Sequence, residues 1–214
     1  MNKMIINDAL EFVRDTFYND YSGHDYFHAL RVCKMAARIA EQENADLTIV
    51  QLAAVLHDVD DVKLSPETYV NKDRAVDFLR KHGISEAMVK TICNIIGEVS
   101  FRGTDSTTPE TVEGKCVQDA DRLDAMGAIG IARAFAYGGS HNRIIYDPEM
   151  KPALNMNADE YQRHISTTIN HFYEKLFQLK DLMNTDTAKK IAGQRENYMK
   201  AYISEFLDEW DGIR

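Results

Sequence analysis

The segment DLTIVQLAAVLHDVDD, residues 46–61, decides the fold class of this chain. Its apolar residues recur at intervals of three and four, which is the period of an α-helix, and Asp46 is a residue type that often caps a helix start. The pattern predicts a helix over 46–58. His57 and Asp58 stand at the end of its apolar stripe, where further apolar residues would be expected. The segment therefore predicts a buried helix that ends in two polar side chains.

The same period runs through most of the chain, and no sustained alternation predicts a strand. We expect an all-α protein with helices at residues 3–18, 26–43, 46–58, 68–82, 85–98, 115–137, 158–183 and 186–210. Glycine, proline and hydroxyl residues predict loops at 99–114 and 138–157. The second loop is long for a compact domain, and with His141 and Arg143 in it we expect a loop that can close over a ligand.

Composition and charge exclude several classes of protein. The net charge is −9, which argues against binding to nucleic acid or to anionic membranes, because both attract a basic face. No stretch approaches the roughly 18 apolar residues that span a bilayer. The three cysteines form no CxxC pair and are expected to be small buried residues. We expect a cytoplasmic protein.

Polar residues also replace apolar ones on two other predicted helices. In the helix over 26–43, His28 begins a stripe that continues with Val32, Met35 and Ile39. In the helix over 115–137, Asp121 begins a stripe that continues with Ala125, Ala128 and Ala132. A single buried histidine is usually a hydrogen-bonded core residue. Several inward imidazoles and carboxylates on separate helices are costly unless they bind a cation. Mixed nitrogen and oxygen ligands suit Mn²⁺, Fe²⁺, Zn²⁺, Co²⁺ or Ni²⁺ and tolerate Mg²⁺. We expect one divalent ion, Mn²⁺ or Mg²⁺ in the first place, with Fe, Co, Ni or Zn as alternatives.

These residues carry a resemblance to a known family. The segments HALRV (28–32), LHDVDD (56–61) and DADRLDA (119–125) resemble the H…HD…D pattern of the HD-domain metal-dependent phosphohydrolases. Longer segments, SGHDYFHALRV, VSFRG and EGKCVQDADRLDAMGAIGIARAFAYGG, resemble a subfamily of small bacterial HD hydrolases, some of which cleave nucleoside triphosphates. The resemblance covers about residues 20–210. It implies a single HD domain over 1–214, with a metal core at 20–137 and C-terminal helices at 158–210 packed on it.

The resemblance also implies the metal ligands, which are His28, His57, Asp58 and Asp121. Asp119 is an alternative last ligand, but in a helix it points about 200° away from Asp121. The family pattern favours Asp121, which leaves Asp124 as a residue that could orient a ligand or a water molecule.

Further residues are candidates for catalysis and substrate binding. Asp61 matches the position where HD hydrolases often carry an acid that aligns the attacking water, whereas Asp60 is expected at the surface. His24 and Lys63 are candidates for proton donation or phosphate contact. The candidate phosphate-binding residues are Lys63, Arg102, Lys115, Arg122, Arg133 and Arg143. For each of these, a structural ion pair is the alternative.

The predicted function is hydrolysis of a phosphoanhydride or phosphoester in a nucleotide, and the subfamily resemblance favours cleavage of a (d)NTP to a (d)NMP and pyrophosphate. Nucleoside monophosphatase and phosphodiesterase activities would use the same site. A metal- or nucleotide-sensing regulator without turnover and a metal-free structural bundle are the alternatives from other classes. The expected partner is a small phosphate-bearing substrate, with a homodimer left open.

Overall fold

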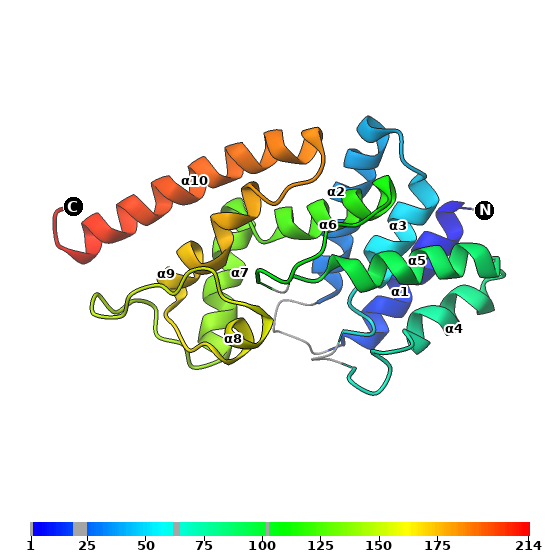
Figure 1. The fold of residues 1–214 in the computed structure, drawn as a ribbon, viewed down its shortest axis with the longest axis horizontal. Coiled ribbons are helices and arrows are strands. Elements are labelled where there is room, and N and C mark those ends of the chain that lie inside the picture. The colour runs from blue at the N-terminus through cyan, green and yellow to red at the C-terminus, as the bar shows by residue number, and fades with distance from the viewer. Residues whose placement is uncertain (1, 19–24, 62–64, 102) are drawn as a thin grey trace. The chain divides into compact units, whose positions relative to one another are not determined.

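The computed structural model describes residues 2–18, 25–61, 65–101 and 103–214. Within these ranges it is all-α, as predicted, and contains no β-strand (Figure 1). The α-helices are α1 (Asn2–Thr16), α2 (Tyr26–Glu43), α3 (Leu47–Leu56), α4 (Asp73–Lys81), α5 (Glu86–Val99), α6 (Val112–Asp124), α7 (Gly127–Ser140), α8 (Ala158–Arg163), α9 (Thr168–His171) and α10 (Asp186–Trp210). A π-helical segment, η1 (Phe172–Leu176), and a 3₁₀ segment, η2 (Gln178–Lys180), connect α9 to α10.

The chain divides into two compact units. Unit 1 comprises residues 1–101 and 106–121, and unit 2 comprises residues 102–105 and 122–214. Helix α6 begins in unit 1 and ends in unit 2. The single domain over 1–214 stays a prediction. Among the described residues, no helix combines the length and the apolarity that a membrane crossing requires.

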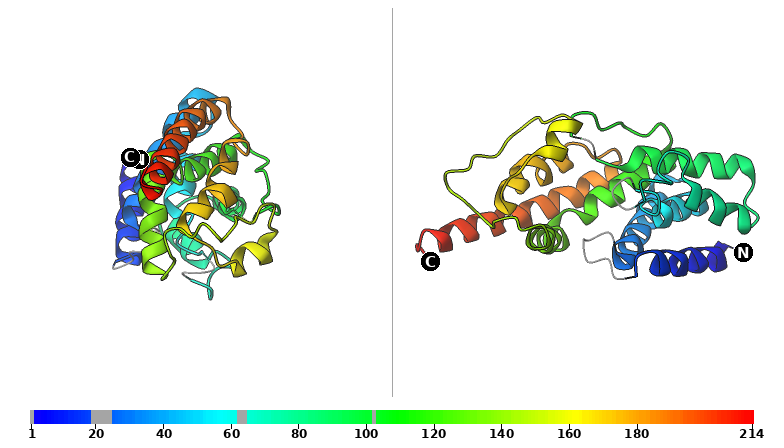
Figure 2. Two further views of the ribbon diagram at one scale, coloured as in Figure 1. Left: turned by 90° about the vertical axis from the view of Figure 1, so that its left-hand side faces the viewer. Right: turned by 90° about the horizontal axis from the view of Figure 1, so that it is seen from below.

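Helix α3 is the centre of unit 1, where it packs against α1, α2 and α5 (Figures 1 and 2). Its start is fixed by Asp46, whose carboxylate accepts hydrogen bonds from two backbone N–H groups at 2.8 and 3.1 Å. Its buried residues are Val50, Leu52, Ala53, Ala54, Val55 and Leu56. Each buried valine or leucine contributes roughly 1.5–3 kcal/mol to stability. The helix ends at Leu56, two residues before the predicted end, so His57 and Asp58 stand in the turn that follows.

Asp60 is buried, which corrects the expectation that it lies at the surface. Its carboxylate accepts hydrogen bonds from the backbone N–H groups of Arg74 at 3.2 Å and Ala75 at 3.0 Å. Those groups belong to the first turn of α4, where helix N–H groups lack partners within the helix. Asp60 thus caps α4 from a distant point in the chain.

The predicted helix over 115–137 is in fact two helices. Helix α6 ends at Asp124, and α7 begins at Gly127, whose φ of +70° is in the left-handed region that favours glycine. Close approach also requires glycine at position 130, because a Cβ there would lie 2.2 Å from the carbonyl oxygen of Ala125. The helical spacing continues across this break, which is why periodicity alone missed it.

The predicted helix over 158–183 is also interrupted. Helix α8 ends at Arg163, α9 begins at Thr168, and the chain then passes through η1 and η2. The side chain of Glu174 in η1 explains part of this local structure. Its carboxylate accepts hydrogen bonds from Ser166 Oγ at 2.7 Å and the Ala153 backbone N–H at 3.2 Å. Glu174 therefore joins three segments of unit 2.

The loop predicted at 138–157 begins later, because α7 continues to Ser140. It is held at several points within unit 2. Asn170 Nδ2 donates to the carbonyl oxygen of Met150 at 2.9 Å, and the carbonyl oxygen of Met156 accepts from the Thr104 backbone N–H at 3.0 Å. These bonds anchor the loop to neighbouring segments in the described conformation.

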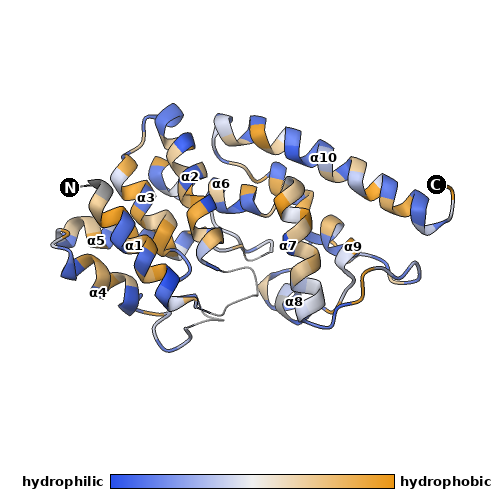
Figure 3. Cartoon of the chain, turned by 180° about the vertical axis from the view of Figure 1, so that it is seen from behind, coloured by the Kyte–Doolittle hydropathy of each residue, from blue (hydrophilic) through white to orange (hydrophobic). Residues whose placement is uncertain are grey.

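The C-terminal helix α10 carries bands of hydrophilic and hydrophobic residues along its length (Figure 3). Its apolar face packs against aromatic residues of other segments in unit 2. The ring centre of Tyr202 lies 6.0 Å from that of Phe135, and the ring centre of Phe206 lies 6.0 Å from that of Tyr146. Phe172 is fully buried, and its ring stacks on that of Tyr202 with 6.3 Å between the ring centres.

Two glycine-to-alanine substitutions test the break between α6 and α7. We expect Gly130→Ala to destabilise the protein by about 1–3 kcal/mol, because the new methyl group would overlap the backbone at Ala125. Gly193→Ala in α10 is the matched control, since a Cβ there meets no atom within 4 Å. It should stabilise the protein by about 0.5–1 kcal/mol through helix propensity. Urea denaturation measures both, and equal midpoints for the two variants would contradict this account of the break.

Candidate metal centre

His28 lies in the first turn of α2 with its side chain inside unit 1, and the residue is 1% exposed. The start of this helix is fixed by Asp25, whose carboxylate accepts a hydrogen bond from the His28 backbone N–H at 2.7 Å. The cap therefore holds the backbone of His28 directly. The imidazole is directed inward by the same helix face that buries Val32, Cys33 and Ala36.

His57 and Asp58 follow α3 directly. The backbone of His57 keeps a helical conformation at the C-cap, and its Nδ1 lies 2.8 Å from the carbonyl oxygen of Ala54. Because a carbonyl oxygen only accepts, Nδ1 carries the proton in this bond and Nε2 is left to face the interior. A hydrogen bond of this kind orients an imidazole for metal ligation.

Four side chains of unit 1 converge at this point. His28 Nε2 lies 3.3 Å from His57 Nε2 and 3.4 Å from Asp58 Oδ2, and His57 Nε2 lies 3.3 Å from Asp58 Oδ1. Asp121, from α6, brings Oδ1 to 3.4 Å from His28 Nε2 and 3.7 Å from His57 Nε2. Helix α2, the turn that follows α3, and helix α6 thus each contribute to one cluster.

The spacing of these atoms fits a divalent cation. An ion with bonds of about 2.1 Å separates adjacent ligand atoms by about 3.0 Å in octahedral and about 3.4 Å in tetrahedral coordination. His28, His57 and Asp58 meet the spacing required of a metal site, and all three are buried. Asp121 is more accessible, with 26% of its side chain exposed. Two imidazoles and two carboxylates form a donor set that suits Mn²⁺, Zn²⁺ and related ions.

The electrostatics of the cluster favour positive charge at its centre. Burial alone would lower the pKa of His57, but the nearby carboxylates of Asp58 and Asp121 raise it above its ordinary value. Burial alone would raise the pKa of Asp121, but hydrogen bonds and charge from His28 and His57 hold it well below its ordinary value. In both cases attraction between the groups exceeds the cost of burial. A divalent cation would supply the same positive charge.

Three further aspartates lie near the cluster residues in the sequence, and the structure places them differently. Asp61 is half-buried, and its backbone N–H donates to the carbonyl oxygen of Asp58 at 3.0 Å, so the two belong to one turn. Asp119 is fully buried in α6. Asp124 pairs with Arg133 in unit 2 at 2.8 Å. Roles for Asp61, Asp119 and Asp124 at the cluster stay predictions.

The basic candidates are distributed over both units. His24, Lys63 and Arg102 lie outside the described residues. Lys115 is half-buried on α6 in unit 1. In unit 2, the guanidinium of Arg122 is buried and donates to the carbonyl oxygen of Leu182, so it has a structural partner. Arg133 likewise holds Asp124 and Arg143 lies over the ring of Tyr137, so phosphate contact by any of them stays a prediction.

The cysteines do not contribute to the described cluster. Cys33 and Cys116 are buried as expected, whereas Cys93 is partly exposed. Burial raises the pKa of the Cys33 thiol to about 11 and that of Cys116 to about 12. Neither thiol is therefore an anionic ligand at neutral pH.

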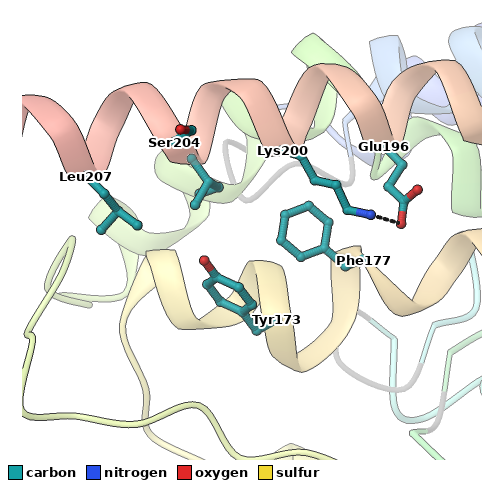
Figure 4. Close-up of a pocket in the computed structure, with 7 residues that line it drawn as sticks. Tyr173, Phe177, Glu196, Lys200, Ser204 and Leu207 are labelled. Atoms are coloured by element: carbon teal, nitrogen blue, oxygen red, sulfur yellow. Dashed lines mark ion pairs between the residues drawn. The ribbon is translucent and has the colours of Figure 1, made fainter.

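The sequence did not predict a cavity of about 510 Å³ between η1 and α10 in unit 2 (Figure 4). Its lining residues are Tyr173, Phe177, Glu196, Lys200, Ile203, Ser204 and Leu207. Glu196 is nearly buried and binds two lysines, Lys180 at 3.1 Å and Lys200 at 3.0 Å. The charged side chains at this cavity therefore form ion pairs with one another or with Lys180. The imidazole–carboxylate cluster of unit 1 is the better candidate for a catalytic site, because it could hold a metal ion.

Comparison with known proteins agrees with the fold and the cluster. The family model of the HD domain matches residues 25–126. Bacillus subtilis YpgQ is 38% identical over 203 residues, which cover 94% of this chain and 91% of YpgQ. The crystal structure of an HD-superfamily hydrolase from Bacillus thuringiensis is 40% identical, with a TM-score of 0.77 and 99% of both chains covered. The structure of YpgQ in complex with ADP is 36% identical, with a TM-score of 0.77, and covers 98% of this chain and 100% of that one.

The fold, the imidazole–carboxylate cluster and these matches define a metal-dependent phosphohydrolase of the HD type. The chain belongs to the YpgQ-like family of HD-superfamily hydrolases. The family resemblance carried by the sequence motifs is thus confirmed.

Removal of a ligand tests the metal centre. We expect His57→Ala and Asp58→Ala each to abolish retention of a divalent ion after dialysis, measured by elemental analysis. An ion at a hundred times its Kd stabilises the folded state by about 2.7 kcal/mol, so a chelator should lower the Tm of the unsubstituted protein by several degrees. The Tm of the two variants should not respond to the chelator.

Two substitutions in unit 1 outside the cluster serve as matched controls. Asp77→Asn removes an aspartate from α4, and His82→Asn removes the histidine that follows this helix. Both variants should keep the metal. Stoichiometric metal in His57→Ala or Asp58→Ala would contradict the assignment.

Proposed function

We propose that this protein hydrolyses a nucleotide, with conversion of a (d)NTP to a (d)NMP and pyrophosphate as the favoured reaction. The imidazole–carboxylate cluster carries the proposal, because it offers a buried site for a divalent ion in an HD-type phosphohydrolase. The solved complex of YpgQ with ADP supports a nucleotide as the ligand, since that protein matches this chain over nearly its whole length. The sequence resemblance supports pyrophosphate release.

The proposed reaction adds water to the α-phosphorus and breaks the bond between that phosphorus and the α,β-bridging oxygen, so that pyrophosphate leaves. A divalent ion held at this site would supply a water molecule of lowered pKa and a positive charge for a phosphoryl oxygen. His28, His57, Asp58 and Asp121 are the proposed ligands. The bond from His57 Nδ1 to Ala54 holds Nε2 in position for ligation.

Asp61 is the proposed residue that aligns the attacking water and accepts its proton. Its place in the same turn as Asp58 supports this role, because the turn fixes its backbone beside a proposed ligand. A positioned carboxylate contributes typically 10²- to 10⁴-fold to such a step. His24 and Lys63 stay proposed partners in proton transfer and phosphate contact.

The substrate's negative charge requires nearby cations in a chain whose net charge is −9. The proposed phosphate contacts come from Lys63, Arg102, Lys115, Arg122, Arg133 and Arg143. We further propose one divalent metal ion as the resident ion, with Mn²⁺ or Mg²⁺ favoured and Fe, Co, Ni or Zn as alternatives, and a cytoplasmic location. A homodimer stays a prediction.

A panel of nucleotides tests the proposal. The purified protein, residues 1–214, is assayed with dNTPs, NTPs, nucleoside monophosphates and cyclic dinucleotides in Mn²⁺, Mg²⁺, Co²⁺ or Ni²⁺. Pyrophosphate and orthophosphate are detected separately. We expect pyrophosphate from triphosphates. Asp61→Asn should lower kcat by about 10²-fold or more while retaining the metal, and the surface variant Asp77→Asn should keep full activity.

Each result of the panel has a defined meaning. Orthophosphate from monophosphates, or cleavage of a phosphodiester alone, would replace the pyrophosphohydrolase with one of the other activities. Silence across all substrates and ions, in a protein that holds its metal, would favour a sensing protein. Unchanged kcat in Asp61→Asn would remove that residue from the proposed chemistry.

A further inference from the structure

Asp60 is a buried acid that the metal cluster does not use. It is 1% exposed, and both oxygens of its carboxylate accept hydrogen bonds from α4. Oδ1 accepts from the backbone N–H of Arg74 at 3.2 Å, and Oδ2 accepts from that of Ala75 at 3.0 Å. Among the described residues, the group that meets the spacing of a metal site does not include Asp60. The role of Asp60 therefore lies in its contact with α4.

Helix α4 has no side-chain cap at its own start. Its N-cap residue is Lys72, which lies in the left-handed region at a φ of +57° and makes no capping hydrogen bond. Lysine has no acceptor atom, so it cannot supply the oxygen that aspartate or serine supplies at a helix start. Asp60 supplies this oxygen from 14 residues before Arg74, and its negative charge lies at the positive end of the helix dipole. The link between Asp60 and α4 is therefore charge-assisted.

Asp60 also belongs to the turn that carries the proposed ligands. His57 and Asp58 precede it, and Asp61 follows it directly. The backbone N–H of Asp61 donates to the carbonyl oxygen of Asp58 at 3.0 Å, so Asp60 lies inside one hydrogen-bonded turn. A rotation of the backbone at Asp60 would therefore move the carboxylates of Asp58 and Asp61.

The contact with α4 fixes the far side of this turn. The turn leaves the end of α3, whereas Asp60 binds the start of α4. Helix α4 packs on α5, and α5 packs on α3, all within unit 1. Both sides of the turn are thus held on one packed set of three helices. Loss of the Asp60 carboxylate would remove the attachment of the turn to α4.

We propose that Asp60 is a positioning residue for the metal centre, because it holds the turn that bears His57 and Asp58 in the geometry that a divalent ion requires. The alternative is that Asp60 only stabilises α4. Ligands must be held within about 0.5 Å and 10–20° of their working geometry, so a loosened turn weakens ion binding while unit 1 stays folded. The inference rests on the metal site of the proposed function, and it concerns binding of the ion rather than the identity of the substrate.

Metal titration of a graded pair of variants tests this role. Asp60→Asn keeps the size of the side chain but has one acceptor oxygen, so it retains at most one of the two bonds, and Asp60→Ala retains neither. We expect the Kd for Mn²⁺ to rise by about tenfold or more in Asp60→Asn, as is typical when a group that orients a metal ligand is lost, and to rise further in Asp60→Ala. The Kd is measured by competition with a chelating dye, at a temperature where circular dichroism shows each variant to be folded.

Asp46→Ala is the matched control. Asp46 also accepts two backbone N–H groups at a helix start, at 2.8 and 3.1 Å, but it does so at the end of α3 opposite to His57. Its loss should lower the Tm by several degrees and leave the Kd for Mn²⁺ unchanged. An equal rise in Kd in Asp46→Ala and Asp60→Asn would overturn the positioning role, because it would show a general loosening of unit 1. Asp60→Asn and Asp60→Ala variants that bind Mn²⁺ as the wild type does would also overturn it.

The visible absorption of bound Co²⁺ separates positioning from stability. These bands depend on the arrangement of the ligand atoms around the ion. They should shift in Asp60→Asn, saturated with Co²⁺, and should match the wild type in saturated Asp46→Ala. Identical spectra in all three proteins would assign Asp60 to the stability of α4 alone.

Amide hydrogen exchange tests the same link in the wild type and requires no variant to fold. Binding free energies are coupled reciprocally, so an ion at the turn should also strengthen the cap of α4. Zn²⁺ should therefore slow exchange at the amides of Arg74 and Ala75 more than at those of Thr48 and Ile49, which Asp46 caps. Equal slowing at both pairs of amides, or none at either, would contradict the coupling.

The fate of the proposed function is read separately. A protein that binds Mn²⁺ more weakly in the two Asp60 variants but cleaves no nucleotide retains the positioning role and loses the hydrolase proposal. A protein that cleaves nucleotides while both variants bind Mn²⁺ normally does the reverse. A wild type that binds no divalent ion would overturn the positioning role together with the metal centre.

Discussion

The burial of imidazole and carboxylate side chains in one small volume is the constraint on which the rest of this structure depends. A charged or polar group in the interior is costly unless it has partners. Here Asp58 and Asp121 together hold the pKa of His57 above its ordinary value against burial, and His28 and His57 together hold that of Asp121 below its ordinary value. The apolar packing of α3 brings His57 to this place. The apolar packing of α3 therefore positions the backbone, and the cluster offers a buried site that could hold a divalent ion.

Much of this was predictable because helical periodicity and inward polar residues leave a clear trace in the sequence. The helix at α2, the cap at Asp46 and the all-α fold follow from local patterns, and these were confirmed. The convergence of His28 with His57 is different. It depends on how α2 packs against α3, so spacing within one helix only suggested it, and the family resemblance supplied the pairing.

The failures have physical reasons. Three aspartates within four residues, Asp58, Asp60 and Asp61, look alike in the sequence, but Asp60 caps α4 through contacts that exist only in the folded chain. The break before α7 depends on a close approach at Gly130, which apolar spacing does not record. The interruption around η1 involves the buried carboxylate of Glu174, whose partners lie 8 to 21 residues away in the chain.

Helix α6 has a further consequence. It contributes Asp121 to unit 1 and continues to Asp124 in unit 2, so one continuous helical backbone serves both. Inserting or deleting one residue within α6 before Asp121 would rotate Asp121 about the helix axis by about 100° and move it by about 1.5 Å along the axis. Its carboxylate would then leave the neighbourhood of His28 Nε2 and His57 Nε2 in unit 1. Length variation among related chains should therefore fall in surface loops and avoid the part of α6 that precedes Asp121.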